Sequence, residues 1–203
     1  MGLYKKHILP GITDFVCSGK SILDQRKKVV PSAKGRVLEI GIGSGLNLQF
    51  YNASIVDRIW GLDPSARMRK RAARRARKFQ FEVDFIGLSG SEIPLAVNSV
   101  DTVLVTYTLC TIPDVVQALR EMKRVLRPGG ELIYCEHGIA PDEEVRRWQK
   151  RLNPIWKRIG GGCNLNRPIP KLIEQGGFKI VSLETRYIPG WKPACFNYWG
   201  SAV

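Results

Sequence analysis

The sequence predicts an α/β fold in which helices cover both faces of a mostly parallel, seven-stranded sheet with one antiparallel strand. Apolar segments rich in Val, Ile and Leu alternate with helical segments from residue 36 onward, which is typical of parallel strands buried on both faces. The last two strand-like segments, 178–188 and 195–203, are joined by a short connection that contains "PGWKP" (189–193). So short a connection joins only antiparallel neighbours, because a parallel crossover needs about a dozen residues or more.

The spacing of apolar residues predicts each element in turn. Residues 4–30 are expected to form one or two helices with a break near Pro10–Gly11, because proline and glycine interrupt helices. The first five strands are expected at 36–40, 57–62, 80–86, 100–107 and 130–137, and helices at 45–52, 65–78, 113–126 and 167–176. We expect one domain over 1–203, with a helical lid at 1–33 and a cap at 138–166 above the carboxyl ends of the strands.

The chain of 203 residues carries a formal net charge of +14, although its charged fraction of 25% and its apolar fraction of 44% are ordinary for a globular protein. The charge favours an anionic partner, or else a solvated basic surface. Eight basic residues lie in 66–78, where the same two interpretations apply: a solvated helix face, or contact with an anionic membrane. Nucleic acid is disfavoured because no aromatic stacking platform accompanies this segment.

The five cysteines lie at least 25 residues apart, so no CxxC motif is present and we expect neither a metal site nor a disulfide framework. Cys110 is expected to pack as a small apolar residue, because no basic neighbour in the sequence would activate its thiol. This cysteine usage favours a reducing cytoplasm. No secretory pattern and no run of 18 apolar residues exists, so no membrane span is expected, and peripheral membrane contact is left open.

The stretch "VLEIGIGSG" ends a strand with Gly41, Gly43 and Gly45. A dinucleotide fingerprint would need glycine where Leu46 stands, and no Gly-Lys-Ser/Thr follows for a phosphate loop. Asp63, at the end of the next strand, could accept hydrogen bonds from both hydroxyls of a ribose. The pattern therefore favours an adenosine ligand without a phosphate, the alternative being a tight turn with Asp63 as a helix cap.

Four features in order, "VLEIGIGSG", Asp63, "SVDTVLVTYTLCTI" and "EMKRVLRPGGELIYCEH", together resemble class I S-adenosylmethionine-dependent methyltransferases over about residues 34 to 137. The resemblance implies the Rossmann-like fold of that family, with S-adenosyl-L-methionine as cofactor and S-adenosyl-L-homocysteine as product. Many members have an acid early in the loop that corresponds to 87–95, where this chain has serines. The implied cofactor-binding residues are Glu39, Gly41, Gly43, Gly45, Asp63, Pro64, Met68, Ser91, Glu92 and Tyr107.

The segment from Cys135 to Phe178 resembles a narrower branch, which contains thiol S-methyltransferases of animals and bacterial relatives that carry phospholipid methyltransferase labels. The residues shared with that branch are Glu136, His137, Trp148, Pro154, Trp156, Lys157, Gly162, Cys163, Leu165, Arg167, Gly200, Ala202 and Val203. The resemblance implies in-line methyl transfer to a small, lipophilic acceptor, with a thiol favoured. The alternatives are the ethanolamine head group of a phospholipid and a nucleic acid.

Glu136 and His137 end the fifth expected strand, at the edge of the sheet where ligands bind. His137 is the candidate general base and Glu136 the alternative, because a histidine titrates near neutral pH; a hydrogen-bonded histidine at a strand end is the competing interpretation. The tryptophans would form an acceptor pocket or the cap's own core, and Arg167 would hold an anionic group or pair with an acid of the cap. The expected substrate-contacting residues are Leu109, Trp148, Trp156 and Arg167.

Overall fold

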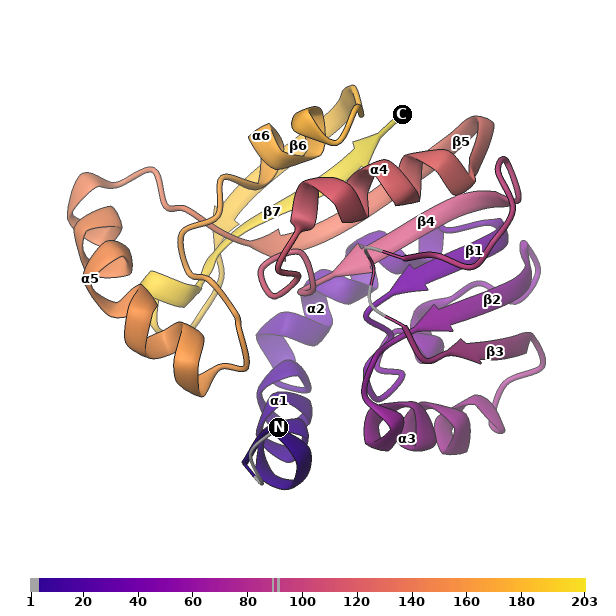
Figure 1. Cartoon of the computed structure of the whole chain (residues 1–203), viewed down its shortest axis with the longest axis horizontal. Helices are drawn as coiled ribbons and strands as arrows, with labels where there is room; N and C mark the ends of the chain where they lie inside the picture. Colours follow the sequence, from indigo (N-terminus) through magenta and orange to yellow (C-terminus); the bar gives the residue numbers. More distant parts are fainter. Residues whose placement is uncertain (1–3, 89, 91) are drawn as a thin grey trace.

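The computed structural model describes residues 4–88, 90 and 92–203, and it shows one seven-stranded sheet with helices on both faces (Figure 1). The strands are β1 (Gly35–Ile40), β2 (Val56–Leu62), β3 (Glu82–Ile86), β4 (Val100–Thr106), β5 (Leu126–His137), β6 (Ile180–Tyr187) and β7 (Phe196–Ala202). Their order across the sheet is β3-β2-β1-β4-β5-β7-β6. The first five strands pair in parallel and β7 is antiparallel to both of its neighbours, which confirms the predicted sheet with one reversed strand.

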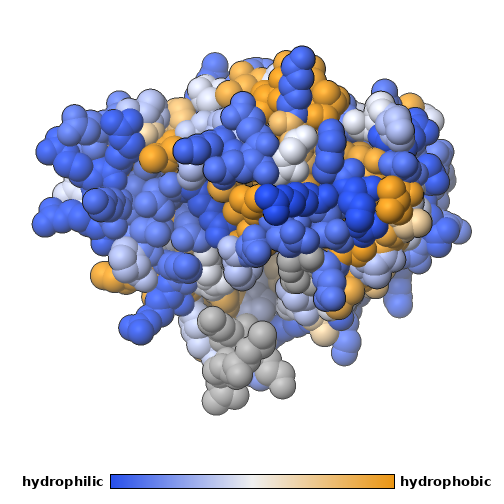
Figure 2. All heavy atoms as spheres, turned by 45° about the horizontal axis from the view of Figure 1, so that its top comes forward, coloured by the Kyte–Doolittle hydropathy of each residue, from blue (hydrophilic) through white to orange (hydrophobic). Residues whose placement is uncertain are grey.

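Successive residues of the central strands point to opposite faces of the sheet, and both faces are apolar. Leu38 joins a core with α4 (Val115–Val125) and α6 (Ile169–Gln175), whereas its neighbour Val37 joins a core with α2 (Lys20–Val29) and α3 (Ala66–Ala76). Strand β4 is buried at every position, as expected for a central strand between two helical layers. Hydrophilic residues cover most of the outer face shown in Figure 2, in keeping with the net charge of +14.

The N-terminal helices break at a different place from the one expected. A π-helical turn, Tyr4–Ile8, leads directly into α1 (Leu9–Cys17), and α2 begins at Lys20. Pro10 lies in the first turn of α1, where a missing N–H costs no helical hydrogen bond. The break falls at Gly19, whose backbone is extended (φ −59°, ψ 141°) ahead of α2.

The helix expected at 45–52 does not form. Residues 44–47 make turns, and one short 3-10 helix follows, Leu48–Phe50. Gly45 has a left-handed φ of +81°, a conformation that ends helices and does not continue them. The apolar residues of this stretch, Leu46 and Leu48, are buried, so their spacing reflects a packed loop.

The predicted cap consists of α5 (Glu143–Ile159), which contains Pro154, and the loop that follows it. Strand β5 begins four residues before its predicted start, at Leu126. The hydroxyl of Tyr4 donates to the carbonyl of Ile159 over 2.7 Å, so the N-terminal segment contacts the end of the cap helix. The remaining 3-10 helices are Val30–Ser32 and Lys192–Ala194. Within the described residues, no helix is both long and apolar enough to span a membrane.

Candidate active site

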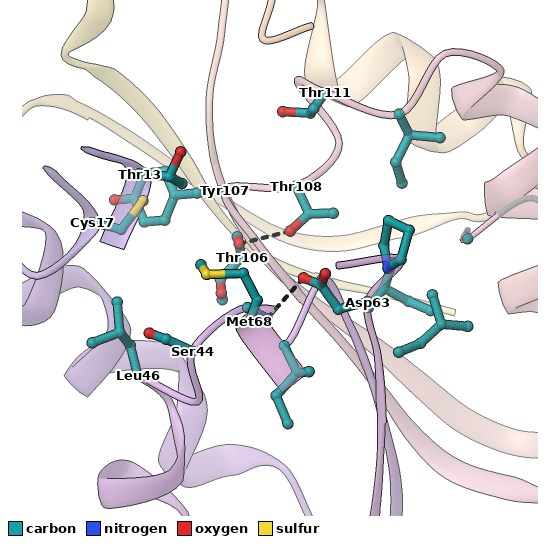
Figure 3. Close-up of a pocket in the computed structure, with 18 of the residues that line it drawn as sticks. Thr13, Cys17, Ser44, Leu46, Asp63, Met68, Thr106, Tyr107, Thr108 and Thr111 are labelled. Carbon is teal, nitrogen blue, oxygen red and sulfur yellow. Dashed lines mark hydrogen bonds between the residues drawn. The ribbon is translucent and has the colours of Figure 1, made fainter. Parts of the chain in front are cut away.

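A cavity of about 260 Å³ lies at the carboxyl ends of β1, β2 and β4 (Figure 3). The glycine loop and the start of α3 form one wall, and Figure 3 shows Asp63 across the cavity from Cys17 and Tyr107. Its lining residues are Thr13, Asp14, Cys17, Arg26, Ile40, Gly41, Ile42, Gly43, Ser44, Leu46, Leu62, Asp63, Pro64, Met68, Gly90, Thr106, Tyr107, Thr108, Thr111, Ile112 and Pro113. The position agrees with the general rule that open α/β sheets bind ligands beyond the carboxyl ends of their strands.

Two of the three glycines of the loop line the cavity, and the third packs against α3. Gly41 and Gly43 line the cavity with left-handed φ values of +72° and +55°. A Cβ on Gly41 would lie 2.1 Å from Oγ1 of Thr108, so no larger residue fits there without displacing the β4 loop. Gly45 lies outside the cavity wall: a Cβ there would lie 3.1 Å from Cα of Ala72. This glycine lets α3 pack closely on the loop, and its expected contact with the cofactor has no support from the described cavity wall.

Asp63 lies at the cavity wall directly after β2. Its Oδ2 accepts the backbone N–H of Gly43 over 3.1 Å, and its Oδ1 accepts the N–H of Ser65 over 2.7 Å. Burial raises the pKa of the Asp63 carboxyl, against the opposing effect of these hydrogen bonds. The N-cap of α3 is Ser65, whose hydroxyl accepts from the N–H of Met68, so Asp63 is not the helix cap.

Glu39 is buried beneath the loop and is not among the described lining residues, so this geometry gives no support to its expected contact with the cofactor. Its Oε1 accepts from Nδ2 of Asn47 over 2.9 Å and its Oε2 from the hydroxyl of Tyr51 over 2.7 Å. Burial raises the pKa of the Glu39 carboxyl to about 7. Both oxygens are therefore occupied in holding the turns that follow β1.

Arg26 is a cavity residue that the sequence did not reveal. It is buried in α2, and its Nη1 donates to Oδ1 of Asn47 over 2.8 Å and to Oγ1 of Thr106 over 2.6 Å. Its Nε finds no hydrogen-bond partner among the described residues. In the sequence Arg26 is one of three consecutive basic residues, so nothing marked it as the buried one.

Pro64 and Met68 line the cavity as expected, together with apolar residues such as Leu62 and Ile112. Ser91 falls outside the described residues. Glu92 is exposed and lies away from the cavity wall, so its expected cofactor contact has no support in this geometry. The part of the cavity around Pro64 and Met68 is therefore mostly apolar.

Tyr107 directly follows β4 and has a left-handed φ of +52°, which is uncommon for a residue other than glycine; such strained residues cluster at functional sites. Its hydroxyl donates to Oδ1 of Asn197 over 2.6 Å, and the guanidinium of Arg26 lies 5.2 Å from its ring centre. The residue lines the cavity as expected.

Glu136 is fully buried and supports the loop after β4. Its Oε1 accepts the N–H groups of Thr108 and Leu109 over 2.6 and 2.9 Å. Burial raises the pKa of its carboxyl. Leu109 is also fully buried, and its carbonyl accepts from Arg167. These three residues support the loop from behind the described cavity wall, so this geometry gives no support to the expectation that they contact substrate or move its proton.

His137 is buried behind the cavity wall. Its Nε2 lies 3.2 Å from Sγ of Cys163, and Cys163 lies 3.6 Å from Sγ of Cys110. The ligand atoms of these three residues all lie within 4.8 Å of one another. His137 is thus not positioned as a base toward the cavity, and Cys110 is not a simple packing residue. Sequence spacing could not reveal the cluster, because 26 and 27 residues separate its members.

The two tryptophans of the cap lie outside the cavity wall. Trp148 is 49% exposed, with the guanidinium of Arg151 lying 5.8 Å from its ring centre. Trp156 packs on Trp191 with ring centres 5.2 Å apart, and its Nε1 lies 3.4 Å from Sγ of Cys163. Trp156 therefore belongs to the cap's own core, and Trp148 faces solvent.

The basic helix α3 is partly used inside the protein. Arg71 donates to Oδ2 of Asp14 over 2.9 Å, and Arg75 donates to the carbonyl of Ser44 over 2.9 Å. Asp14 also accepts from the hydroxyl of Ser44, and Arg67 donates to the carbonyl of His7 over 2.8 Å. The sequence had suggested a solvated or membrane-facing helix, yet these arginines fasten α1 to the glycine loop.

Comparison with known proteins decides the family. A family model described as a methyltransferase domain matches residues 38–134. The chain is 35% identical to human thiol S-methyltransferase TMT1B over 194 residues, which cover 92% of this chain and 78% of the relative. The chain is a class I S-adenosylmethionine-dependent methyltransferase.

The methyltransferase also resembles more distant proteins. It is 30% identical to a phosphatidylethanolamine N-methyltransferase of Cereibacter sphaeroides over 51% of each chain. A crystal structure of a SAM-dependent methyltransferase from Aquifex aeolicus superposes with a TM-score of 0.64 at 18% identity, covering 96% of this chain and 98% of that one. At that identity the likeness shows the fold alone, and it confirms the Rossmann-like class I architecture.

The cavity of the methyltransferase fits S-adenosylmethionine. The unpartnered Nε of Arg26 is suited to the carboxylate of the cofactor's methionine part. The carboxylate of Asp63 is suited to the ribose hydroxyls, and the bare backbone at Gly41 and Gly43 leaves room for close approach. Met68 and its apolar neighbours are suited to the adenine. We assign these contacts from donor and acceptor chemistry.

Proposed function

We propose that this methyltransferase methylates the sulfur of a small, lipophilic thiol. The observation that carries the proposal is that both carboxylates in the described cavity wall already have partners within the protein. Asp63 accepts two backbone N–H groups, and Asp14 is ion-paired with Arg71. No histidine is among the described lining residues. An acceptor that ionises with little help from a base suits such a wall.

A thiol meets this requirement better than other neutral nucleophiles. Thiols ionise with a pKa of about 8.5, so a useful fraction is thiolate near neutral pH. An alcohol would need a base in contact with its proton, and an alkylamine is mostly protonated near neutral pH. The relative at 35% identity is named a thiol S-methyltransferase, which supports the same acceptor class.

The chain's own residues would contribute binding, orientation and exclusion of water. When bound, S-adenosylmethionine supplies an electrophilic methyl group on a sulfonium. Arg26 and Asp63 would hold the two polar ends of the cofactor, and Tyr107 and Thr108 would border the space between cofactor and acceptor. The α1 residues Thr13 and Cys17 line the same cavity and would cover the acceptor from the N-terminal side.

A transfer assay with matched acceptors tests the proposal. An alkanethiol, an alkylamine and an alkanol with the same carbon chain are incubated separately with the enzyme and S-adenosylmethionine, and products are identified by mass spectrometry. We expect the methyl thioether, with the amine and alcohol at background. A methylated amine without a thioether would contradict the thiol assignment and leave the enzyme class intact.

A phospholipid head group is the second candidate, favoured by the surface of α1. Four large apolar side chains of this region are at least 47% exposed, and Phe15 reaches 81%. The arginines of α3 lie beside them, since Arg67 contacts His7. An apolar ridge beside cations is the pattern of an interfacial helix. The exposed apolar residues are Ile8, Ile12, Phe15 and Val16.

Vesicle co-sedimentation tests this candidate. Vesicles containing phosphatidylethanolamine and an anionic lipid are spun with wild type and with Phe15→Asp, and methylated lipid is measured in the pellet. The lipid candidate predicts binding that Phe15→Asp weakens, together with N-methylated lipid. Binding without lipid methylation would indicate a membrane-facing enzyme with another acceptor, and an absence of binding would remove the candidate. Val97→Asp, at another exposed apolar position (59%), is the control.

A further inference from the structure

Cys110, His137 and Cys163 form a cluster of possible metal ligands outside the described cavity wall. The three residues come from the turn after β4, the end of β5 and the loop after α5. Their contacts are 3.6 Å between the two sulfurs and 3.2 Å between Nε2 of His137 and Sγ of Cys163. All three ligand atoms lie within 4.8 Å of one another. Two thiols and an imidazole thus converge on one point.

Two of the three separations in the cluster are close to the edges of a metal coordination tetrahedron. Zinc bonds of about 2.3 Å to sulfur and about 2.0–2.1 Å to nitrogen place two sulfurs roughly 3.8 Å apart and a sulfur and a nitrogen roughly 3.5 Å apart. The observed separations of 3.6 and 3.2 Å differ from these by a few tenths of an ångström. The third pair, Cys110 and His137, lies within 4.8 Å, so binding of zinc would draw these two side chains closer together.

The surroundings hold the ligands in place. The side-chain amide of Asn164 donates to the carbonyls of Cys110 and Gly162 over 2.9 Å each, which ties the two cysteine-bearing segments together. The indole N–H of Trp156 points to Sγ of Cys163 over 3.4 Å, a donor suited to a metal-bound thiolate.

We propose that Cys110, His137 and Cys163 bind one zinc ion through Sγ, Nε2 and Sγ. Sulfur and imidazole ligands favour zinc over magnesium or calcium. On binding, the protons of the two thiols leave to solvent and the two thiolates balance the charge of the dication. The sequence had suggested no metal site because the ligands are far apart along the chain, and the fold brings them together.

The site offers three protein ligands among the described residues, which is the number found in zinc sites that keep one position for a substrate. It borders the cavity: Sγ of Cys110 lies 3.4 Å from Oγ1 of Thr111, and Thr111 lines the cavity wall. If the acceptor is a thiol, as proposed above, its S–H bond would break, its proton would leave to solvent, and its sulfur would take the fourth position. The metal would then supply the activation that no side chain provides.

Metal content is the first test, and it needs no activity. Protein purified with reductant and without chelators is supplied with zinc, desalted and measured by elemental mass spectrometry. We expect about one zinc per chain in wild type and in the control Cys195→Ser, which alters a buried cysteine outside the cluster. Cys163→Ser and Cys110→Ser should lose it, with circular dichroism confirming that each variant is folded. Equal zinc in wild type and Cys163→Ser, or a Cys110–Cys163 disulfide in fresh metal-free protein, would overturn the site.

Cobalt substitution tests the open position. Thiolate-to-cobalt absorption is expected in wild type and in Cys195→Ser, and not in Cys163→Ser. Adding an alkanethiol should change the spectrum of the wild type, whereas the matched alkanol should not. An unchanged spectrum in a protein that does bind metal would overturn the substrate-coordinating role. Because these readouts are independent of turnover, they stay interpretable if the transfer assay assigns a different acceptor.

Discussion

At the ends of β1 and β2, Asp63, Gly41 and Gly43 line the cavity, whereas at the end of β5 the polar residues Glu136 and His137 are buried against the protein's own loops. The first region presents free backbone and a carboxylate to a ligand. In the second region, Glu136 accepts hydrogen bonds from the loop after β4, and His137 contacts Cys163. Along the same edge of the sheet, the ends of β1 and β2 thus face the cavity, and the end of β5 supports the loops beside it.

Gly41→Ala would break the cofactor region most severely. The added Cβ would lie 2.1 Å from Oγ1 of Thr108 on a backbone with φ +72°. We expect the free energy of unfolding to fall by about 2–4 kcal/mol and S-adenosylhomocysteine binding to be lost by calorimetry. Gly129→Ala is the matched control, with φ +78° and no heavy atom within 4 Å. An equal loss of stability and of binding in both variants would show that the loop after β4 moves to make room for the added Cβ, and would contradict the prediction.

Glu39 gives a pH-dependent prediction. Burial raises the pKa of its carboxyl from 4.5 to about 7, so the folded protein holds a proton that the unfolded chain releases. Its contribution to stability is therefore lost as the pH rises from about 4.5 to 7, by roughly 2–3 kcal/mol in total. Urea unfolding across this range should show Glu39→Gln gaining stability relative to wild type as the pH rises. The exposed Glu82→Gln should run parallel to wild type.

Asp63→Asn sharpens the assignment of the ribose contact. The amide keeps the shape of the side chain and the acceptor for one N–H group, but it loses the charge that strengthens hydrogen bonds from ribose hydroxyls. We expect affinity for S-adenosylhomocysteine to fall about 10–100-fold by calorimetry. Asp57→Asn, at the exposed start of β2, should leave the affinity unchanged. Unchanged affinity in Asp63→Asn would move the ribose elsewhere in the cavity.

Trp148→Ala should have the smallest effect. The side chain is 49% exposed and lies away from the cavity wall, so we expect kcat and KM for the acceptor to change by less than about twofold and stability by about 0.5 kcal/mol or less. A large rise in KM would place Trp148 in the acceptor site and restore the role suggested by the sequence.

The cofactor region was largely predictable because its features are local. A strand, two cavity-lining glycines and the acid after the next strand occur in fixed order, and their places follow from the parallel sheet. The exceptions are Glu39 and Gly45, which do not line the described cavity. The carboxylate of Glu39 accepts hydrogen bonds from Asn47 and Tyr51, and Gly45 packs against Ala72. These partners depend on how the loop turns, which the sequence pattern did not indicate.

The acceptor region was less predictable because its contacts join distant residues. Glu136 supports a loop 27 and 28 residues away, and Cys110 meets Cys163 across 53 residues. Arg26 contacts Thr106 across 80 residues. Strand and helix periodicity give the order of elements, but the rotation of a helix decides which of several like residues faces inward.

In helix α1 a charged residue faces the protein and large apolar residues face outward. Its polar residue Asp14 points inward to Ser44 and Arg71, while Ile12 and Phe15 face outward. Helix α1 is therefore fastened over the cavity by an ion pair, and because the Asp14–Arg71 contact of 2.9 Å is partly buried, salt screens it only in part. The position of α1 over the cavity should therefore depend on the ion pair between Asp14 and Arg71 more than on the apolar residues Ile12 and Phe15, which face outward.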